Sequence, residues 1–267
     1  MNSFPEIDVV IVNFNSGHAL AKCIESIGVC KGIHLFVVDN CSTDDSLKAV
    51  TQTFDQVNLI KNKDNKGFAT ACNQGAQAGT SPHIALINPD CFIDGEQLML
   101  LSQALNQDVN AALIGCRVLN DDGSLQAASR RRLPTFWRVL FHLSRLSHWS
   151  LFKGININDN GQFKQVVEVE AVNGACVMVK RTDFDRVGGF DQDYPLHFED
   201  LDLFTKLKQR GKKLIYQSNI EVKHLHGHSD QSPKQINVWK KQGLIRYFEK
   251  HRPRWEARLI TWMTRLK

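Results

Sequence analysis

The chain has 267 residues, of which 42% are hydrophobic and 23% are charged, an ordinary composition for a globular protein with a sizeable core. This composition excludes a disordered chain, and no stretch approaches the roughly 18 apolar residues that a membrane-spanning helix needs. The net charge of +5 is mild, so the position of the positive charge is more informative than its total.

The seven cysteines are scattered and form no close pair of the kind that a zinc site uses. We therefore expect reduced thiols in a cytoplasmic protein. The N-terminal segment has Glu6 before its apolar run and no basic region, which predicts a first strand and not a signal peptide.

The first half of the chain alternates apolar strands with segments of helical period. We expect strands at residues 7–12, 33–38, 57–61 and 83–87, with helices between them. This order predicts an α/β fold with a doubly wound, mostly parallel sheet and flanking helices. Ligands in such folds bind at the carboxyl ends of the strands, where the chain places Asn13, Asn15, Asp39, Asn40, Asn88 and Asp90.

The second half is more mixed in its patterns. It predicts a helix at 98–105, a strand at 111–118, strand material at 166–180, a helix at 201–209 and a strand at 213–217. A basic helical segment is expected at 238–266. The chain shows no internal repeat and no low-complexity linker.

Two short patterns suggest a metal site. Asp90 follows a buried strand, where a carboxylate can hold Mg²⁺ or Mn²⁺, although the sequence around it is also a good turn. His224, His226 and His228 alternate after another strand, which suits metal ligation by imidazole. A solvated histidine-rich loop is the alternative interpretation.

Two further patterns suggest chemistry at helix starts. Glu199, Asp200 and Asp202 lie close together before an apolar run, so one could act as a general base, whereas all three could simply favour a helix N-terminus. Asn65 and Gly67 open a helix of small residues, where the backbone can approach an anion or pack closely on the sheet.

Taken in order, the motifs of this chain resemble those of family 2 glycosyltransferases with the GT-A fold, in particular the bacterial rhamnosyltransferase-like branch. The resemblance covers roughly residues 6–230 and is carried by VVIVNFNS, VVDNCSTDDS, NKDNKGFATACNQG, LINPDCF, NGACVMVKRTDFDRVGGFDQDYPLHFEDLDL and VKHLHGHS. It implies a metal-dependent, inverting enzyme that moves a sugar from a nucleoside diphosphate. The QxxRW motif of processive members is absent, which favours transfer of a single sugar.

The resemblance also implies a role for individual residues. Asp200 would be the general base and Glu199 would assist it. Asp90 and His224 would hold Mg²⁺ or Mn²⁺, with His226 as an alternative to His224, while Asn88 replaces the first aspartate of the family's DxD motif. The remaining contacts to the nucleotide-sugar donor would come from Asn13, Asn15, Asp39, Asn40, Asn65, Gly67, Phe68, Asn73, Asn88, Asn173 and Gly174.

Similarity to this branch implies L-rhamnose from dTDP-rhamnose as the donor and a polyprenyl-diphosphate-linked saccharide as the acceptor, in O-antigen or cell-wall polysaccharide synthesis. It divides the chain into a GT-A domain at 1–230 and a basic helical tail at 231–267. Within the domain, 1–120 would bind the nucleotide and 121–230 would supply the acceptor and catalytic residues.

Residues 130–157 and the tail interleave many cations with aromatic side chains. We expect both segments to form amphipathic helices on an anionic membrane, at the inner face of the cytoplasmic membrane. Core-packing helices with solvated basic faces are the alternative, and no nucleic acid partner is expected. The oligomeric state is left open.

Two other functions compete with the transferase. A sugar nucleotidyltransferase would need a glycine-rich phosphate loop near the N-terminus, and residues 13–17 do not supply one. A catalytically inactive nucleotide-sugar-binding module would differ from the transferase only in lacking turnover.

Overall fold

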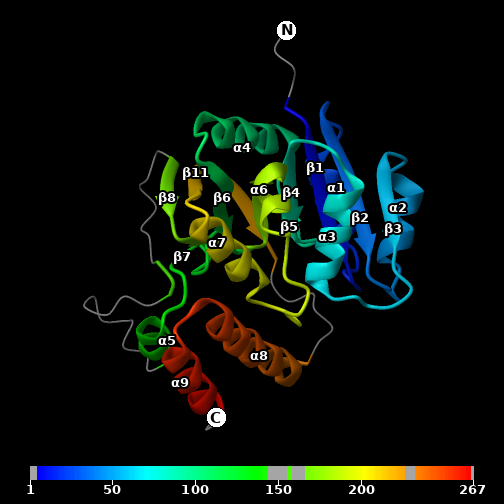
Figure 1. Ribbon diagram of the computed structural model, residues 1–267. Coiled ribbons are helices and arrows are strands. Elements are labelled where there is room, and N and C mark those ends of the chain that lie inside the picture. The colour runs from blue at the N-terminus through cyan, green and yellow to red at the C-terminus, as the bar shows by residue number, and fades with distance from the viewer. Residues whose placement is uncertain (1–4, 144–154, 158–165, 226–231, 266–267) are drawn as a thin grey trace.

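The computed structural model describes residues 5–143, 155–157, 166–225 and 232–265. A central sheet is flanked by helices, and three helices lie together below it, away from the N-terminal end of the chain (Figure 1). These three are α5 (Phe136–Leu143), α8 (Pro233–His251) and α9 (Arg254–Arg265).

The first half forms the parallel part of the sheet, in the order β3-β2-β1-β4. Every residue of β1 is buried, because helices cover the sheet on both faces. The predicted doubly wound arrangement is therefore confirmed. Its elements are β1 (Ile7–Asn13), α1 (Ala19–Ile27), β2 (Ile33–Asp39), α2 (Ser46–Thr53), β3 (Val57–Lys61), α3 (Phe68–Ala78) and β4 (His83–Ile87).

The second half extends the sheet with a change of direction. Strand β10 (Cys176–Lys180) lies antiparallel between β4 and β6 (Ala111–Leu119), and β11 (Lys213–His224) then runs parallel to β6. Short strands β5 (Cys91–Phe92) and β8 (Val166–Val169) pair antiparallel with β11. The remaining elements are α4 (Gly95–Gln107), β7 (Arg130–Arg131), β9 (Ala171–Val172), α6 (Arg181–Arg186) and α7 (Glu199–Gln209).

Two predicted strands differ from the structure. The strand material expected at 166–180 is divided into β8, β9 and β10, because β8 pairs with β11, β9 with β7, and β10 with β4 and β6. Strand β11 continues past 217 to His224, after an irregularity in its register between Gln217 and Glu221. This continuation carries His224 to the sheet edge beside β5.

The small residues of α3 allow it to lie directly on the sheet. Ala69, Ala71 and Cys72 are buried, and a Cβ added at Gly75 would overlap the side chain of Val10 on β1. The backbone of α3 therefore packs directly against the sheet, with no large side chain between them. Its N-terminus is thereby fixed at the carboxyl edge of the sheet.

The basic helical tail is part of the core. Tyr247 and Phe248 of α8 and Ile260 of α9 are buried in the same apolar cluster as Leu203 and Phe204 of α7. Hydrophobic burial therefore holds α8 and α9 against the domain that carries the sheet. The boundary proposed between 230 and 231 stays a prediction, but the two parts share one core.

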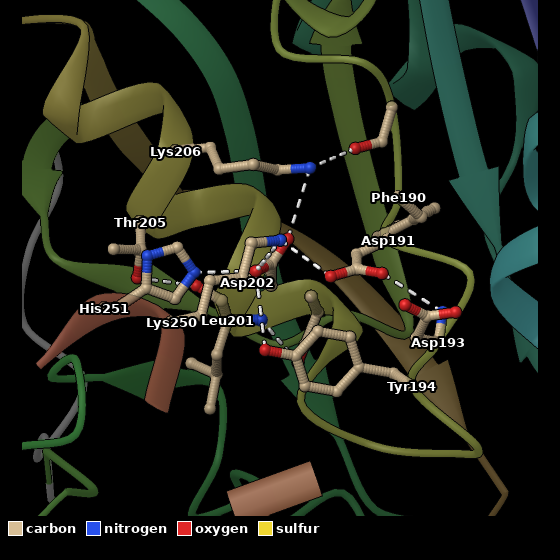
Figure 2. Close-up of polar contacts among 12 residues, drawn as sticks. Phe190, Asp191, Asp193, Tyr194, Leu201, Asp202, Thr205, Lys206, Lys250 and His251 are labelled. Carbon is tan, nitrogen blue, oxygen red and sulfur yellow. Dashed lines mark hydrogen bonds and ion pairs between the residues drawn. The ribbon is translucent and has the colours of Figure 1, made fainter. Parts of the chain in front are cut away.

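An ion-pair cluster joins α7 to α8 (Figure 2). Asp202 is fully buried, and its Oδ1 accepts hydrogen bonds from His251 Nε2 at 2.6 Å and from Lys250 Nζ, which lies 2.8 Å away. Burial alone would raise the pKa of Asp202, but His251, Lys250 and the charge of Lys206 outweigh it and lower the pKa. Lys250 also contacts Asp191, 2.7 Å away.

We predict that Asp202→Asn lowers the free energy of unfolding by about 3 kcal/mol near neutral pH, because it leaves buried cations without their counter-ion. The loss should appear in urea denaturation and should shrink below about pH 4, where the wild-type carboxylate begins to lose its advantage over the unfolded chain. Asp193→Asn is the matched control, since Asp193 is exposed and pairs with Arg246 at the rim. Equal losses in the two variants would contradict this account.

Candidate functional site

The ends of β1 and β2 are joined by polar side chains. Asn13, which is fully buried, donates from Nδ2 to Asp39 Oδ1 at 2.8 Å, and the Ser42 backbone N–H donates to Asp39 Oδ2. Asn15 has a left-handed φ of +51°, and its Oδ1 accepts the Thr43 N–H at 2.8 Å. Asn13 can therefore serve a ligand only by holding Asp39, whereas Asn15 orders the loop that follows β2.

A second group of predicted donor contacts lies at the start of α3. Asn40 Nδ2 donates to Asn65 Oδ1 at 2.8 Å, and Asn40 Oδ1 accepts the Lys66 N–H at 2.9 Å. Gly67 begins the helix with a φ of +83°, and open space lies where its side chain would be. The backbone is therefore open to a ligand at this helix start.

Phe68 and Asn73 contact the segment before α7. The Phe68 ring lies 6.3 Å from that of Phe190. Buried Asn73 donates from Nδ2 to the Phe190 carbonyl and accepts the Phe190 N–H at Oδ1, both at 2.9 Å. Its amide thus holds the chain at Phe190, a different task from the donor contact that the resemblance implies.

Asp90 and His224 meet because β5 pairs with the end of β11. The register places Cys91 opposite His224, and Asp90 Oδ1 lies 3.3 Å from His224 Nε2. The loop is held from the other side, where the Asn88 N–H donates to the Ala175 carbonyl at 2.8 Å. The structure therefore brings together two predicted metal ligands. His226, the alternative ligand, lies outside the described residues.

Gln126 fixes the orientation of His224. Its Nε2 donates to the His224 carbonyl at 3.0 Å, so its Oε1 must face the other way, towards His224 Nδ1 at 3.2 Å. Asn173 Nδ2 also donates to this Oε1, at 3.0 Å. Nδ1 therefore carries a proton, and Nε2 is the ring nitrogen that faces Asp90, where a neutral ring offers its lone pair.

This pair fits a divalent cation. A carboxylate oxygen and an imidazole lone pair repel each other at 3.3 Å unless a proton or a cation lies between them. Oxygen and imidazole ligands suit Mg²⁺ and Mn²⁺. Cys91 is close to both, but burial raises the pKa of its thiol well above the usual value, and a protonated thiol is a poor ligand for such ions.

Asp200 lies at the N-terminus of α7 in an ion pair with Arg131. The Arg131 Nη2 contacts Asp200 Oδ2, while its Nε donates to the Val172 carbonyl at 3.0 Å. A Cβ on Gly174 would lie only 2.7 Å from Asp200 Oδ2, so glycine permits this close approach. In the sequence, Arg131 belongs only to the basic segment at 130–157, because nothing in the local pattern shows that β7 brings it to Asp200.

Glu199 and Asp200 are adjacent but differ in environment. Glu199 is buried, and its Oε2 has no hydrogen-bond partner within the described part of the chain. Burial and the nearby charge of Asp200 raise the pKa of Glu199 to about 8. At neutral pH Glu199 therefore holds its proton, which leaves Asp200 as the carboxylate that can accept one.

The loop before these residues is strained. His197 and Phe198 have left-handed φ angles of +67° and +72°, which cost on the order of 1 kcal/mol each for non-glycine residues. Helix α8 braces them at Gly243, where a Cβ would lie 2.9 Å from the His197 carbonyl oxygen. Packing of α8 therefore sets the position of Asp200.

A continuous chain of contacts joins the pair Asp90 and His224 to Asp200. Asp90 faces His224, His224 and Asn173 share Gln126, and the next residue after Asn173, Gly174, packs on Asp200. Sequence reasoning missed Gln126 and the contact of Arg131. A lone glutamine in an ordinary loop carries no signal, since its importance comes only from the strand ends that it bridges.

Comparison with known proteins identifies the family of this chain. Residues 8–188 match the family described as Glycosyl transferase family 2. The N-acetylglucosaminyl-diphospho-decaprenol L-rhamnosyltransferase of Mycobacterium tuberculosis is 27% identical, over 84% of this chain and 77% of its own. Rhamnosyltransferase WbbL of Escherichia coli K12 is 23% identical, over 84% of this chain and 85% of its own.

The fold is also similar to that of a solved mannosyltransferase. PcManGT from Pyrobaculum calidifontis, in complex with GDP-Man and Mn²⁺, has a TM-score of 0.62 and 18% identity. The likeness covers 93% of this chain but 64% of that protein, so this chain spans just under two thirds of it. The predicted GT-A architecture is thereby confirmed.

We predict that Glu199→Gln changes the pH dependence of stability. Because the native state raises the pKa of Glu199 from 4.5 to about 8, wild-type stability should fall as pH rises from about 4.5 to 8 and change no further above that. The variant lacks this group, so the difference in free energy of unfolding should shift in its favour between about pH 5 and 8 and stay constant above. Urea denaturation across this range measures the gain, with exposed Glu168→Gln as the control. A difference that is constant with pH would refute the assignment.

We predict that Gln126→Met weakens Mn²⁺ binding by about 10- to 100-fold, because His224 loses the partner that fixes its tautomer. Isothermal titration of the folded protein measures this affinity. Asn106→Leu is the matched control, since Asn106 contacts the ring of another buried histidine, His83, outside the site. Unchanged affinity in Gln126→Met, alongside wild-type binding, would show that Gln126 does not position the ligand.

Proposed function

Since this chain belongs to glycosyl transferase family 2, we propose that it moves one sugar from a nucleoside diphosphate to a saccharide acceptor, with a divalent metal and with inversion. One observation carries the proposal. The facing pair Asp90 and His224 is linked through Gln126 and Asn173 to the loop that packs on Asp200. A cation-binding pair and a proton acceptor therefore border the same segment of chain.

Asp200 is the proposed general base. Arg131 holds one of its oxygens, and the Leu201 N–H donates to the other at 2.7 Å, so the carboxylate has a fixed orientation. Neighbouring Glu199 keeps its own proton near neutral pH, so it does not compete with Asp200 for the proton of the acceptor hydroxyl. A base placed in this way assists the attack of a hydroxyl group.

Transfer would proceed as a single displacement. The acceptor hydroxyl gives its proton to Asp200 as its oxygen bonds to the anomeric carbon of the donor sugar. The bond from that carbon to the diphosphate breaks, and the diphosphate leaves with the electron pair. Attack opposite the leaving group inverts the anomeric centre.

Asp90 and His224 are the proposed ligands of Mg²⁺ or Mn²⁺. When bound, the cation would neutralise charge on the departing diphosphate. The presence of Mn²⁺ with GDP-Man in the solved mannosyltransferase of similar fold supports this choice. Around the nucleotide, Asp39, Asn15 and the open backbone at Gly67 are the proposed contacts.

The donor and the acceptor are proposed from the relatives. Two of them are named rhamnosyltransferases, which favours L-rhamnose from dTDP-rhamnose. The mycobacterial relative is named for a decaprenol-diphosphate-linked acceptor, which favours a polyprenyl-diphosphate-linked saccharide in O-antigen or cell-wall polysaccharide synthesis. Such an acceptor would draw the enzyme to the inner face of the cytoplasmic membrane as a peripheral protein.

We predict that Asp200→Asn lowers sugar transfer by about 10²- to 10⁴-fold, because the acceptor loses its base. Nucleotide affinity should remain near wild type, measured as the thermal shift with dTDP, UDP or GDP in the presence of Mn²⁺. Asp193→Asn, at the exposed rim of the loop before α7, is the control. Wild-type turnover in Asp200→Asn would overturn the base, and no turnover in the wild type would favour an inactive nucleotide-sugar-binding module.

A further inference from the structure

Helix α9 has an unusual distribution of side chains. Its buried face consists of Glu256, Ala257 and Ile260. Its opposite, exposed face carries apolar and basic side chains together: Arg254, Trp255, Arg258, Leu259, Trp262 and Arg265. A helix that only packs on a core would place its aromatic residues inwards, yet Trp255 and Trp262 are 50% and 61% exposed.

This face continues onto α5. The Phe136 ring lies 5.8 Å from Trp255 and 5.2 Å from Trp137, which is 57% exposed. The Phe136 N–H donates to Glu256 Oε2 at 3.1 Å, which fixes the start of α5 to α9. Figure 1 shows the two helices beside each other. We call Trp137 together with the exposed residues of α9 the α9 face.

The cations of the tail divide into two groups. On α8, Arg246 and Lys250 pair with acidic residues such as Asp191, and Arg252 at its end pairs with Glu256. The arginines of the α9 face form no ion pair within the described residues. All three, Arg254, Arg258 and Arg265, line a hollow of about 410 Å³ together with Trp262, with Glu249 as its single acidic residue. The positive charge of this face is therefore available to an anionic partner.

We propose that the α9 face is a docking surface for a bilayer of anionic phospholipids. Indole rings settle at the boundary between headgroups and acyl chains, while arginine side chains reach lipid phosphates. On the α9 face, tryptophan and arginine side chains alternate along helix α9. None of the helices in the described part of the chain has the length and hydrophobicity of a membrane span.

One residue of the α9 face, Trp137, is joined to the proposed site by a short stretch of chain. Arg131, which contacts Asp200, is followed directly by the segment that leads to Phe136 and α5. Docking through this face would bring Asp200 towards the lipid surface, where a lipid-linked acceptor would lie. In this respect the inference rests on the proposed function. The part of the predicted basic segment at 144–154 lies outside the described residues.

The test is sedimentation of the full chain with vesicles that contain phosphatidylglycerol, compared with vesicles of phosphatidylcholine alone. Wild-type protein should bind only the anionic vesicles, and added salt should weaken binding. The double variant Trp255→Ser/Trp262→Ser should lower the partition coefficient by about tenfold or more, because its polar side chains cannot enter the interface. The matched control is Val29→Ser/Val109→Ser, which removes exposed apolar side chains outside the α9 face.

Three outcomes would overturn the proposal: no binding by the wild type, equal binding by the double variant, or equal loss in the control. Loss of binding in the presence of competing RNA, with no effect of the tryptophan substitutions, would indicate a polyanion site instead. Since vesicle binding needs no turnover, its failure is distinct from failure of the proposed function. Transfer to a water-soluble acceptor should stay at the wild-type level in the double variant.

Discussion

The segment 172–175, which runs from the last residue of β9 to the start of β10, holds the parts of the site together. The Val172 carbonyl anchors Arg131, Asn173 binds Gln126, Gly174 allows Asp200 to approach, and the Ala175 carbonyl holds the loop that carries Asp90. Strand β10 fixes this segment, because it runs antiparallel between β4 and β6 and is bonded on both sides. A change of sheet direction therefore creates the place where residues from four separate parts of the chain meet.

The position of Asp200 depends on contacts between α8 and the chain on either side of this residue. The left-handed conformation of His197 and Phe198 is unfavourable by itself, and it persists because α8 packs on it through Gly243. The buried cluster around Asp202 ties α8 to α7 just beyond Asp200. The helices that the sequence assigns to a tail thus support the base, while the α9 face stays exposed.

The sequence predicts the parallel half of the sheet well, since buried strands, turn residues and small helix residues all indicate the same local structure. It also selects Asp90, His224 and Asp200 as candidates, and these three residues lie around one segment of the structure. Gln126 and Arg131 escape prediction because their importance arises from long-range pairing of β5 with β11 and of β7 with β9. The roles of the basic residues in the tail also escape prediction, because their sequence pattern is uniform. In the structure, basic residues of α8 form ion pairs with acidic residues of the domain, whereas the arginines of α9 are exposed.

The proposed reaction is the transfer of a sugar in one displacement, with Asp200 as the base. The most direct measurement is the anomeric configuration of the product by proton NMR, with the nucleotide sugar that gives the largest Mn²⁺-dependent thermal shift as donor. The wild type should form a product with the configuration opposite to that of the donor, and Asp200→Asn should not form it. A product that retains the donor's configuration would contradict the proposed reaction.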